Sequence, residues 1–149
     1  MKKSLIVGVD GTEGGRAAVD EAIALAIDLH ATVTFAFVCK PPSAMLGNPL
    51  YQRGISADLA QAHRAIAESV ERANGAGIEA DSEILEGDPG DELVSLADNR
   101  NAHMIVVGSR GHGALAGALL GSVSQSVSQH ASRPVVVAKQ TQGDARQVA

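Results

Sequence analysis

Short, continuously apolar runs alternate with segments of helical periodicity, and this alternation most constrains the fold. The first run, Leu5–Val9, is rich in β-branched residues and ends at Asp10-Gly11, which is typical of a strand buried on both faces. In the next segment, Glu13–His30, alanine and leucine recur at helical spacing, and this predicts an amphipathic helix. Strands joined by crossover helices form a mostly parallel, doubly covered sheet. The chain therefore predicts an open α/β fold.

The later segments continue the same alternation. We expect further strands at Thr32–Val38, Ile78–Leu85, His103–Val107 and Pro134–Ala138, and further helices at Leu59–Ala73, from Pro89 to about residue 100, and after Gly121. Asp88 before Pro89 is a strong helix start, because Asp88 can cap and Pro89 suits the first helical position. Glu79, Asp81 and Glu83 share one face of the third strand, which predicts an edge strand.

A single domain, residues 1–149, accommodates the whole pattern, since a chain of this length fits one core. The segment Lys40–Gly54 holds three prolines and two glycines. Loops of that length are usually functional or mobile, so we predict a loop and a candidate lid there. The polar tail, residues 140–149, is expected to fray.

Composition argues against several kinds of partner. Aromatic residues make up 2% of the chain and the formal net charge is -5, whereas nucleic-acid sites need stacking rings and positive charge. No run approaches the roughly 18 apolar residues of a membrane span. Cys39 is the only cysteine, which favours a reducing compartment. We expect a cytoplasmic protein that binds neither nucleic acid nor membrane.

A glycine- and serine-rich segment after the fourth predicted strand has the character of a phosphate site. Its two parts are Gly108-Ser109-Arg110-Gly111 at the strand end and Gly121-Ser122-Val123-Ser124 at a helix start. Glycine lets the backbone approach an anion closely, and free N–H groups of a first helical turn favour phosphate. The same serines also match a capping box, in which Ser122 caps its own helix. On these residues alone both interpretations stay open.

Three other phosphate-binding patterns fit less well. A Walker A loop needs a Gly-Lys pair, which the chain lacks. Gly111–Ala116 matches the dinucleotide pattern G-x-G-x-x-A, but no acid follows the next predicted strand to bind a ribose. A receiver domain would match Asp10 and Lys139, but the aspartate expected after the third strand is missing.

The spacing Gly108-x2-Gly111-x9-Gly121-Ser122 resembles the nucleotide-binding signature of the universal stress protein family, in its ATP-binding branch. The resemblance extends to the opening IVGVDGTEGGRAAVDEA and the closing RPVVVAK, and so spans nearly the whole chain. It implies a five-stranded parallel sheet in the order 3-2-1-4-5 with an ATP site at the strand carboxyl ends. It also implies a homodimer made through the last strands.

Carried over position by position, the resemblance implies a set of nucleotide contacts. Asp10 would contact the ribose or the adenine. The backbone of Val38 would contact the adenine, and here Phe37 precedes Val38 where many relatives have histidine. The other implied contacts, to the ribose and the phosphate chain, are Val107, Gly108, Arg110, Gly111, Gly121, Ser122, Val123 and Ser124.

These features favour a nucleotide-binding stress regulator over an enzyme. ATP, with or without Mg²⁺, would bias a homodimer toward a regulatory protein partner that the sequence does not identify. No base or nucleophile is paired at the site, so we assign no catalytic residue and no metal ligand. Slow ATP hydrolysis or phosphoryl transfer is the first alternative, and an NAD(P)-dependent oxidoreductase is the second.

The dimer also has an argument of its own. In the order 3-2-1-4-5 the strand Pro134–Ala138 lies at an edge, and it contains three successive valines. An exposed apolar edge strand invites pairing with another chain. We therefore expect the homodimer to form through this strand.

Overall fold

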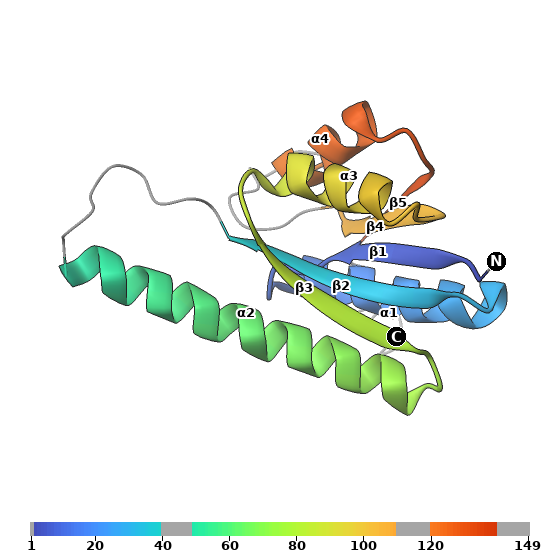
Figure 1. Ribbon diagram of the computed structural model, residues 1–149, viewed down its shortest axis with the longest axis horizontal. Helices are drawn as coiled ribbons and strands as arrows, with labels where there is room; N and C mark the ends of the chain where they lie inside the picture. Colours follow the sequence, from blue (N-terminus) through green and yellow to red (C-terminus); the bar gives the residue numbers. More distant parts are fainter. Residues whose placement is uncertain (1, 40–48, 110–119, 140–149) are drawn as a thin grey trace, which may run out of the picture.

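A parallel sheet organises the molecule (Figure 1). The computed structural model describes residues 2–39, 49–109 and 120–139, and within 49–58 only the backbone. The sheet order is β3-β2-β1-β4-β5, with every pair parallel. The strands are β1 (Ser4–Gly8), β2 (Thr32–Cys39), β3 (Ala80–Glu86), β4 (Met104–Gly108) and β5 (Val135–Ala138). The predicted fold class and strand order are confirmed.

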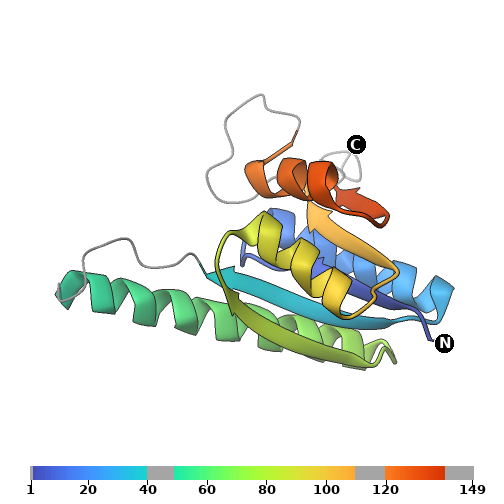
Figure 2. The same ribbon diagram turned by 45° about the horizontal axis from the view of Figure 1, so that its top comes forward.

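The described helices cover both faces of this sheet. They are α1 (Glu13–Leu29), α2 (Pro49–Gly75), α3 (Pro89–Asn99) and α4 (Ser122–His130). Helices α1 and α2 pack on one face, and α3 and α4 pack on the other (Figures 1 and 2). None of the described helices has the length and apolar character needed to cross a bilayer.

The central strands are apolar on both faces because helices cover both. In β1, Leu5 and Val7 belong to the core under α1 and α2, whereas Ile6 belongs to the core under α3 and α4. All three side chains are fully buried, as is Phe35 of β2. A continuously apolar run is the sequence pattern of such a doubly covered strand, which is why these strands could be recognised.

Side-chain caps begin α1 and α3 close to the predicted positions. The Thr12 hydroxyl oxygen accepts a hydrogen bond from the Gly15 N–H at 3.2 Å. The Asp88 carboxylate accepts one from the Asp91 N–H at 3.1 Å, and Pro89 is the first residue of α3. These caps place both helix starts within a few residues of the carboxyl ends of β1 and β3.

The start of α2 corrects one prediction. We predicted a loop over Lys40–Gly54, but α2 begins at Pro49 and includes Gly54. Proline is favoured at the first helical position because its φ is already helical, and one interior glycine costs a helix only about 1 kcal/mol. The rest of the predicted lid, residues 40–48, lies outside the described residues and stays a prediction.

One arginine joins the end of α3 to the edge of the sheet. Nη1 of Arg100 donates to Thr34 Oγ1 and to Asp81 Oδ2, both at 2.9 Å, and Nη2 donates to Glu83 Oε1 at 2.5 Å. The Thr34 hydroxyl also donates to Asp81 Oδ1 at 2.5 Å. The acidic strand β3 is an edge strand, as predicted, and two of its acids pair with one guanidinium.

Asp81 is expected to make stability depend on acid pH. Burial opposes ionisation of Asp81, but hydrogen bonds from Thr34 and Arg100 outweigh it and lower the pKa of this carboxyl. A lowered folded pKa stabilises the protein above the unfolded pKa of about 3.9, and this contribution is lost as pH falls through the folded pKa. Because the Asp81 side chain is 59% exposed, we expect less than about 1 kcal/mol.

Urea unfolding of wild type and Asp81→Asn between neutral and strongly acidic pH measures this contribution. The wild type should be the more stable at neutral pH, and the difference should shrink as Asp81 becomes protonated. A difference that is the same at every pH would contradict the assignment to this carboxylate.

Candidate functional site

The carboxyl ends of β1 and β4 are neighbours at the point where the strand order reverses. Open α/β sheets bind ligands in the crevice at such a point. Asp10 follows β1, Gly108 ends β4, and α4 begins at Ser122. Predicted site residues from separate segments therefore come to one edge of the sheet.

Hydrogen bonds join the two parts of the glycine-rich segment directly. The Gly121 N–H donates to the Ser109 carbonyl at 2.5 Å. The Ser124 hydroxyl lies 3.0 Å from that same oxygen and 3.1 Å from the Gly121 carbonyl. Ser109 continues the ladder with β5, since its N–H donates to the Ala138 carbonyl at 2.8 Å. The start of α4 is therefore anchored on the end of β4.

This arrangement changes the role expected of the Ser124 side chain. We predicted Ser124 as a contact of the phosphate chain, but its hydroxyl is directed at two backbone carbonyls and the residue is 1% exposed. Ser124 holds the site together instead, and its backbone N–H is the group left for a ligand. Ser109 belongs to the predicted two-part segment, but we predicted no role of its own for it. It acts through its backbone, and no side-chain pattern in the sequence signals that.

The first turn of α4 leaves donors without acceptors among the described residues. Gly121 is the N-cap, with φ -78° and ψ 173°, and no side chain caps the helix. The Gln125 N–H donates to the Gly121 carbonyl at 3.0 Å, so the N–H groups of the three preceding residues are the unpaired donors of a helix start. These residues are Ser122, Val123 and Ser124. Such donors, with the helix dipole, suit an anion.

The capping-box interpretation of this segment is wrong. It required Ser122 to be the cap, whereas Ser122 is the first helical residue and Gly121 takes the cap position. The hydroxyl of Ser122 therefore does not occupy the helix N–H groups, and the phosphate interpretation is the one that the geometry favours.

Removing the Ser124 hydroxyl is expected to loosen the anchored helix. We expect Ser124→Ala to lower the free energy of unfolding by about 1 kcal/mol, because a buried hydrogen bond to backbone carbonyls is lost. Urea unfolding measures this change. Ser128→Ala is the matched control, since the Ser128 hydroxyl bonds to the Ser124 carbonyl within α4 itself. Equal effects of the two substitutions would contradict the anchoring role.

Asp10 is positioned by the cap of α1. Its Oδ1 accepts hydrogen bonds from the Thr12 N–H at 2.9 Å and from the Thr12 hydroxyl at 2.5 Å. A Cβ at Gly15 would lie 2.4 Å from the same oxygen, so this close approach requires glycine. Oδ2 of Asp10 has no hydrogen bond to any described residue and is left for a ligand hydroxyl.

Val38 offers backbone groups at the same edge. The Val9 N–H donates to the Ala36 carbonyl at 2.9 Å, and the pairing of β1 with β2 ends there. Backbone groups alternate in direction along a strand, so those of Val38 point the same way as those of Ala36. They face the space beyond the end of β1, while the Val38 side chain packs in the core under α3 and α4.

The remaining predicted residues fall into two groups. Val107 is buried in the core under α3 and α4, and Gly108 pairs with Ala138 of β5, so only their backbones can meet a ligand. Arg110 and Gly111 lie outside the described residues, and their contacts stay predictions. The described residues contain no cluster of three or more His, Cys, Asp or Glu suited to a metal ion.

Comparison with known proteins finds sequence relatives over most of the chain. The model of the universal stress protein family matches residues 1–139. Universal stress protein Rv1636 from Mycobacterium tuberculosis is 32% identical over 118 residues, which are 77% of this chain and 81% of that protein.

Solved structures share the fold. Universal stress protein UspA from Lactobacillus plantarum has a TM-score of 0.83 at 23% identity, covering 91% of this chain and 97% of that one. A universal stress protein crystallised in complex with cAMP has a TM-score of 0.70 at 29% identity, covering 94% of this chain and 98% of that one.

Proposed function

The chain belongs to the universal stress protein family, and we propose that it binds ATP at the carboxyl ends of β1, β2 and β4. The observation that carries the proposal is the row of unpaired N–H groups at Ser122, Val123 and Ser124, anchored on Ser109. A phosphate chain suits these donors. The relative solved with cAMP supports an adenine nucleotide as the ligand class.

Three parts of the site would divide the nucleotide between them. The N–H and C=O groups of Val38 suit the donor and acceptor edge of adenine, and Oδ2 of Asp10 suits a ribose hydroxyl. The start of α4 takes the phosphates, together with Gly121. The backbones of Val107 and Gly108, with Arg110 and Gly111, complete the proposed contacts.

The phosphate contacts are strong enough for useful affinity. A charge-assisted hydrogen bond contributes about 1.5–3 kcal/mol. Three of them would supply a large part of the roughly 8 kcal/mol that micromolar binding requires. The helix start alone should therefore favour nucleotides over nucleosides.

We propose a regulator rather than an enzyme. Within the described part of the site, the Ser124 hydroxyl bonds to backbone carbonyls, and the Thr12 hydroxyl that donates to Asp10 also caps α1 by accepting from the Gly15 N–H. Both hydroxyls therefore serve the local structure, and we assign neither a nucleophilic role. Phosphate release under multiple-turnover conditions should be far slower than the roughly 1 per second of ordinary enzymes. A rate in that ordinary range would favour the hydrolase alternative.

Nucleotide released from the purified protein tests the proposal. The protein is denatured, the soluble fraction is separated by chromatography, and ATP is titrated calorimetrically against protein freed of nucleotide. With no tryptophan and one tyrosine, bound adenine should dominate the near-ultraviolet absorbance. An empty protein that also ignores added ATP would exclude the proposal, and released NAD(P) would favour the dinucleotide alternative.

We also propose that β5 joins two copies of the chain. Strand β4 bonds to the carbonyls of Pro134 and Ala138 at 2.9 and 2.8 Å, so the N–H and C=O groups of Val135 and Val137 point away from the sheet. Unpaired groups on an apolar edge favour strand pairing. Light scattering should give about twice the 15.2 kDa of one chain, and a single-chain mass would contradict the dimer.

A further inference from the structure

Strand β3 carries unpaired backbone groups at the edge opposite β5. The Val33 N–H donates to the Glu79 carbonyl at 3.1 Å, and the Gly87 N–H donates to the Cys39 carbonyl at 2.9 Å. The backbone N–H and C=O groups of odd-numbered residues of β3 therefore point toward β2, and those of even-numbered residues point away from the sheet. The outward residues are Ala80, Ser82, Ile84 and Glu86. No strand of the described residues pairs with this edge.

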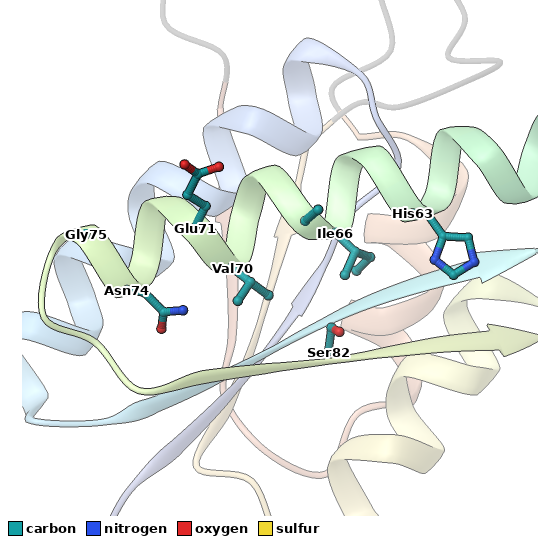
Figure 3. Close-up of a pocket in the computed structure, with 8 residues that line it drawn as sticks. His63, Ile66, Val70, Glu71, Asn74, Gly75 and Ser82 are labelled. Atoms are coloured by element: carbon teal, nitrogen blue, oxygen red, sulfur yellow. The ribbon is translucent and has the colours of Figure 1, made fainter.

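A groove runs beside this edge, between α2 and β3. Figure 3 shows Ile66 and Val70 of α2 pointing toward Ser82 of β3, with His63 on the same side of the helix. The cavity volume is about 810 Å³. Ala80 and Ile84 also pack on the α2 side. An extended segment paired with β3 would therefore place every second side chain in a mostly apolar groove.

The other face of β3 is acidic. Asp81 and Glu83 point to the α3 side, where Arg100 pairs with both at 2.9 and 2.5 Å. Lys2 pairs with Glu79 at 3.1 Å. On this face the three carboxylates of Glu79, Asp81 and Glu83 therefore outnumber the two cations. Glu71 and the even-numbered Glu86 lie on the groove side instead.

This charge pattern selects one kind of occupant. A second copy of β3 would bring like charges together, which is unfavourable across a strand pair. A segment with basic side chains toward Asp81 and Glu83 would be complementary. An added strand would therefore be complementary if it placed apolar side chains on the α2 side and basic side chains on the α3 side.

We propose that the β3 edge and the α2 groove, together the β3–α2 site, bind an extended segment of another protein in which basic and apolar residues alternate. Backbone hydrogen bonds to Ser82 and Ile84 hold the segment, its apolar side chains lie against Ile66 and Val70, and its basic side chains meet the acids of β3. The site lies at the opposite edge from β5, so it stays open in the proposed dimer. It does not depend on bound nucleotide.

A fluorescein-labelled peptide of alternating lysine and valine is the probe. Anisotropy should show saturable binding to the full chain, with and without ATP, and weaker binding at high salt because the charges are screened. A peptide with glutamate in place of lysine should not bind. If the lysine peptide does not bind, the proposal is overturned. Titration of ATP into the same sample tests the nucleotide proposal separately.

Two variants locate the bound peptide. Ser82→Pro removes an outward N–H without breaking a β2–β3 bond, since an edge strand accepts proline there. We expect peptide affinity about threefold to tenfold weaker. Glu83→Lys reverses one charge of the acidic face and should weaken binding through charge alone. Asp28→Lys, an exposed reversal on α1, is the matched control and should leave binding unchanged.

Two results would overturn the assignment. Equal weakening by Asp28→Lys and Glu83→Lys would show a general attraction to an acidic protein rather than a site. A change of oligomeric state in Ser82→Pro without peptide would show that a second copy occupies the edge. Circular dichroism confirms folding, and Glu83→Lys keeps the test decisive if the proline variant does not fold.

Discussion

Replacing Gly121 by valine is expected to weaken ATP binding about 100-fold or more while the fold persists. Gly121 is the buried N-cap of α4, and its φ of -78° and ψ of 173° are also accessible to valine. We expect the added side chain to obstruct the approach of the proposed phosphate to the N–H groups of Ser122 and Val123. Losing one or two charge-assisted bonds, at about 1.5–3 kcal/mol each, corresponds to about 100-fold in affinity.

Calorimetric ATP titrations and urea unfolding measure both halves of this expectation. Gly75→Val is the matched control, because Gly75 ends α2 and a Cβ there meets nothing within 4 Å. Unchanged affinity in Gly121→Val would refute the placement of the phosphates. If that variant does not fold, Ser122→Pro replaces it. Proline is favoured at this first helical position and removes one donor, so ATP should bind about tenfold more weakly.

Gly90→Ala is expected to lower the free energy of unfolding by about 1–3 kcal/mol. A Cβ at Gly90 would lie 2.4 Å from the hydroxyl oxygen of Ser126 and 2.7 Å from its Cβ. Helices α3 and α4 therefore meet closely only because residue 90 is glycine. A methyl group would push α4 aside, and because α4 carries the proposed phosphate donors, ATP affinity should fall as well.

A second substitution tests this explanation. Ser126→Gly removes the atoms that the new methyl would strike, at the cost of about 1 kcal/mol for a glycine inside a helix. In the Gly90→Ala background it should restore ATP affinity, and urea unfolding should show a favourable coupling of at least about 0.5 kcal/mol. Effects that simply add would show that the two residues do not meet.

Much of the fold could be predicted because its signals are local. The run Leu5–Val9 is apolar at every position since both faces of β1 are covered, and Thr12 and Asp88 begin their helices through side chains that the sequence displays. The start of α2 could not be predicted in the same way. Pro49 serves equally well in a loop and at the first position of a helix, and only the structure distinguishes the two.

Less of the site could be predicted. The sequence placed Asp10, Val38 and Gly108 at strand ends, where the structure has them. The hydrogen bond from the Gly121 N–H to the Ser109 carbonyl joins backbone groups that lie far apart in the sequence, and no residue type in the sequence indicates such a bond. The sequence also left Ser122 as a plausible cap, because a local motif does not decide which residue is the last one outside the helix.

Backbone amide shifts during a nucleotide titration test the central claim most directly. Isotope-labelled protein is titrated with ATP and, separately, with adenosine, and the amide resonances are followed by NMR. We predict that the amides of Ser122, Val123 and Ser124 shift with ATP and not with adenosine, because they bind the phosphate chain, while the Val38 amide shifts with both. ATP binding that leaves those three amides unmoved would contradict the account.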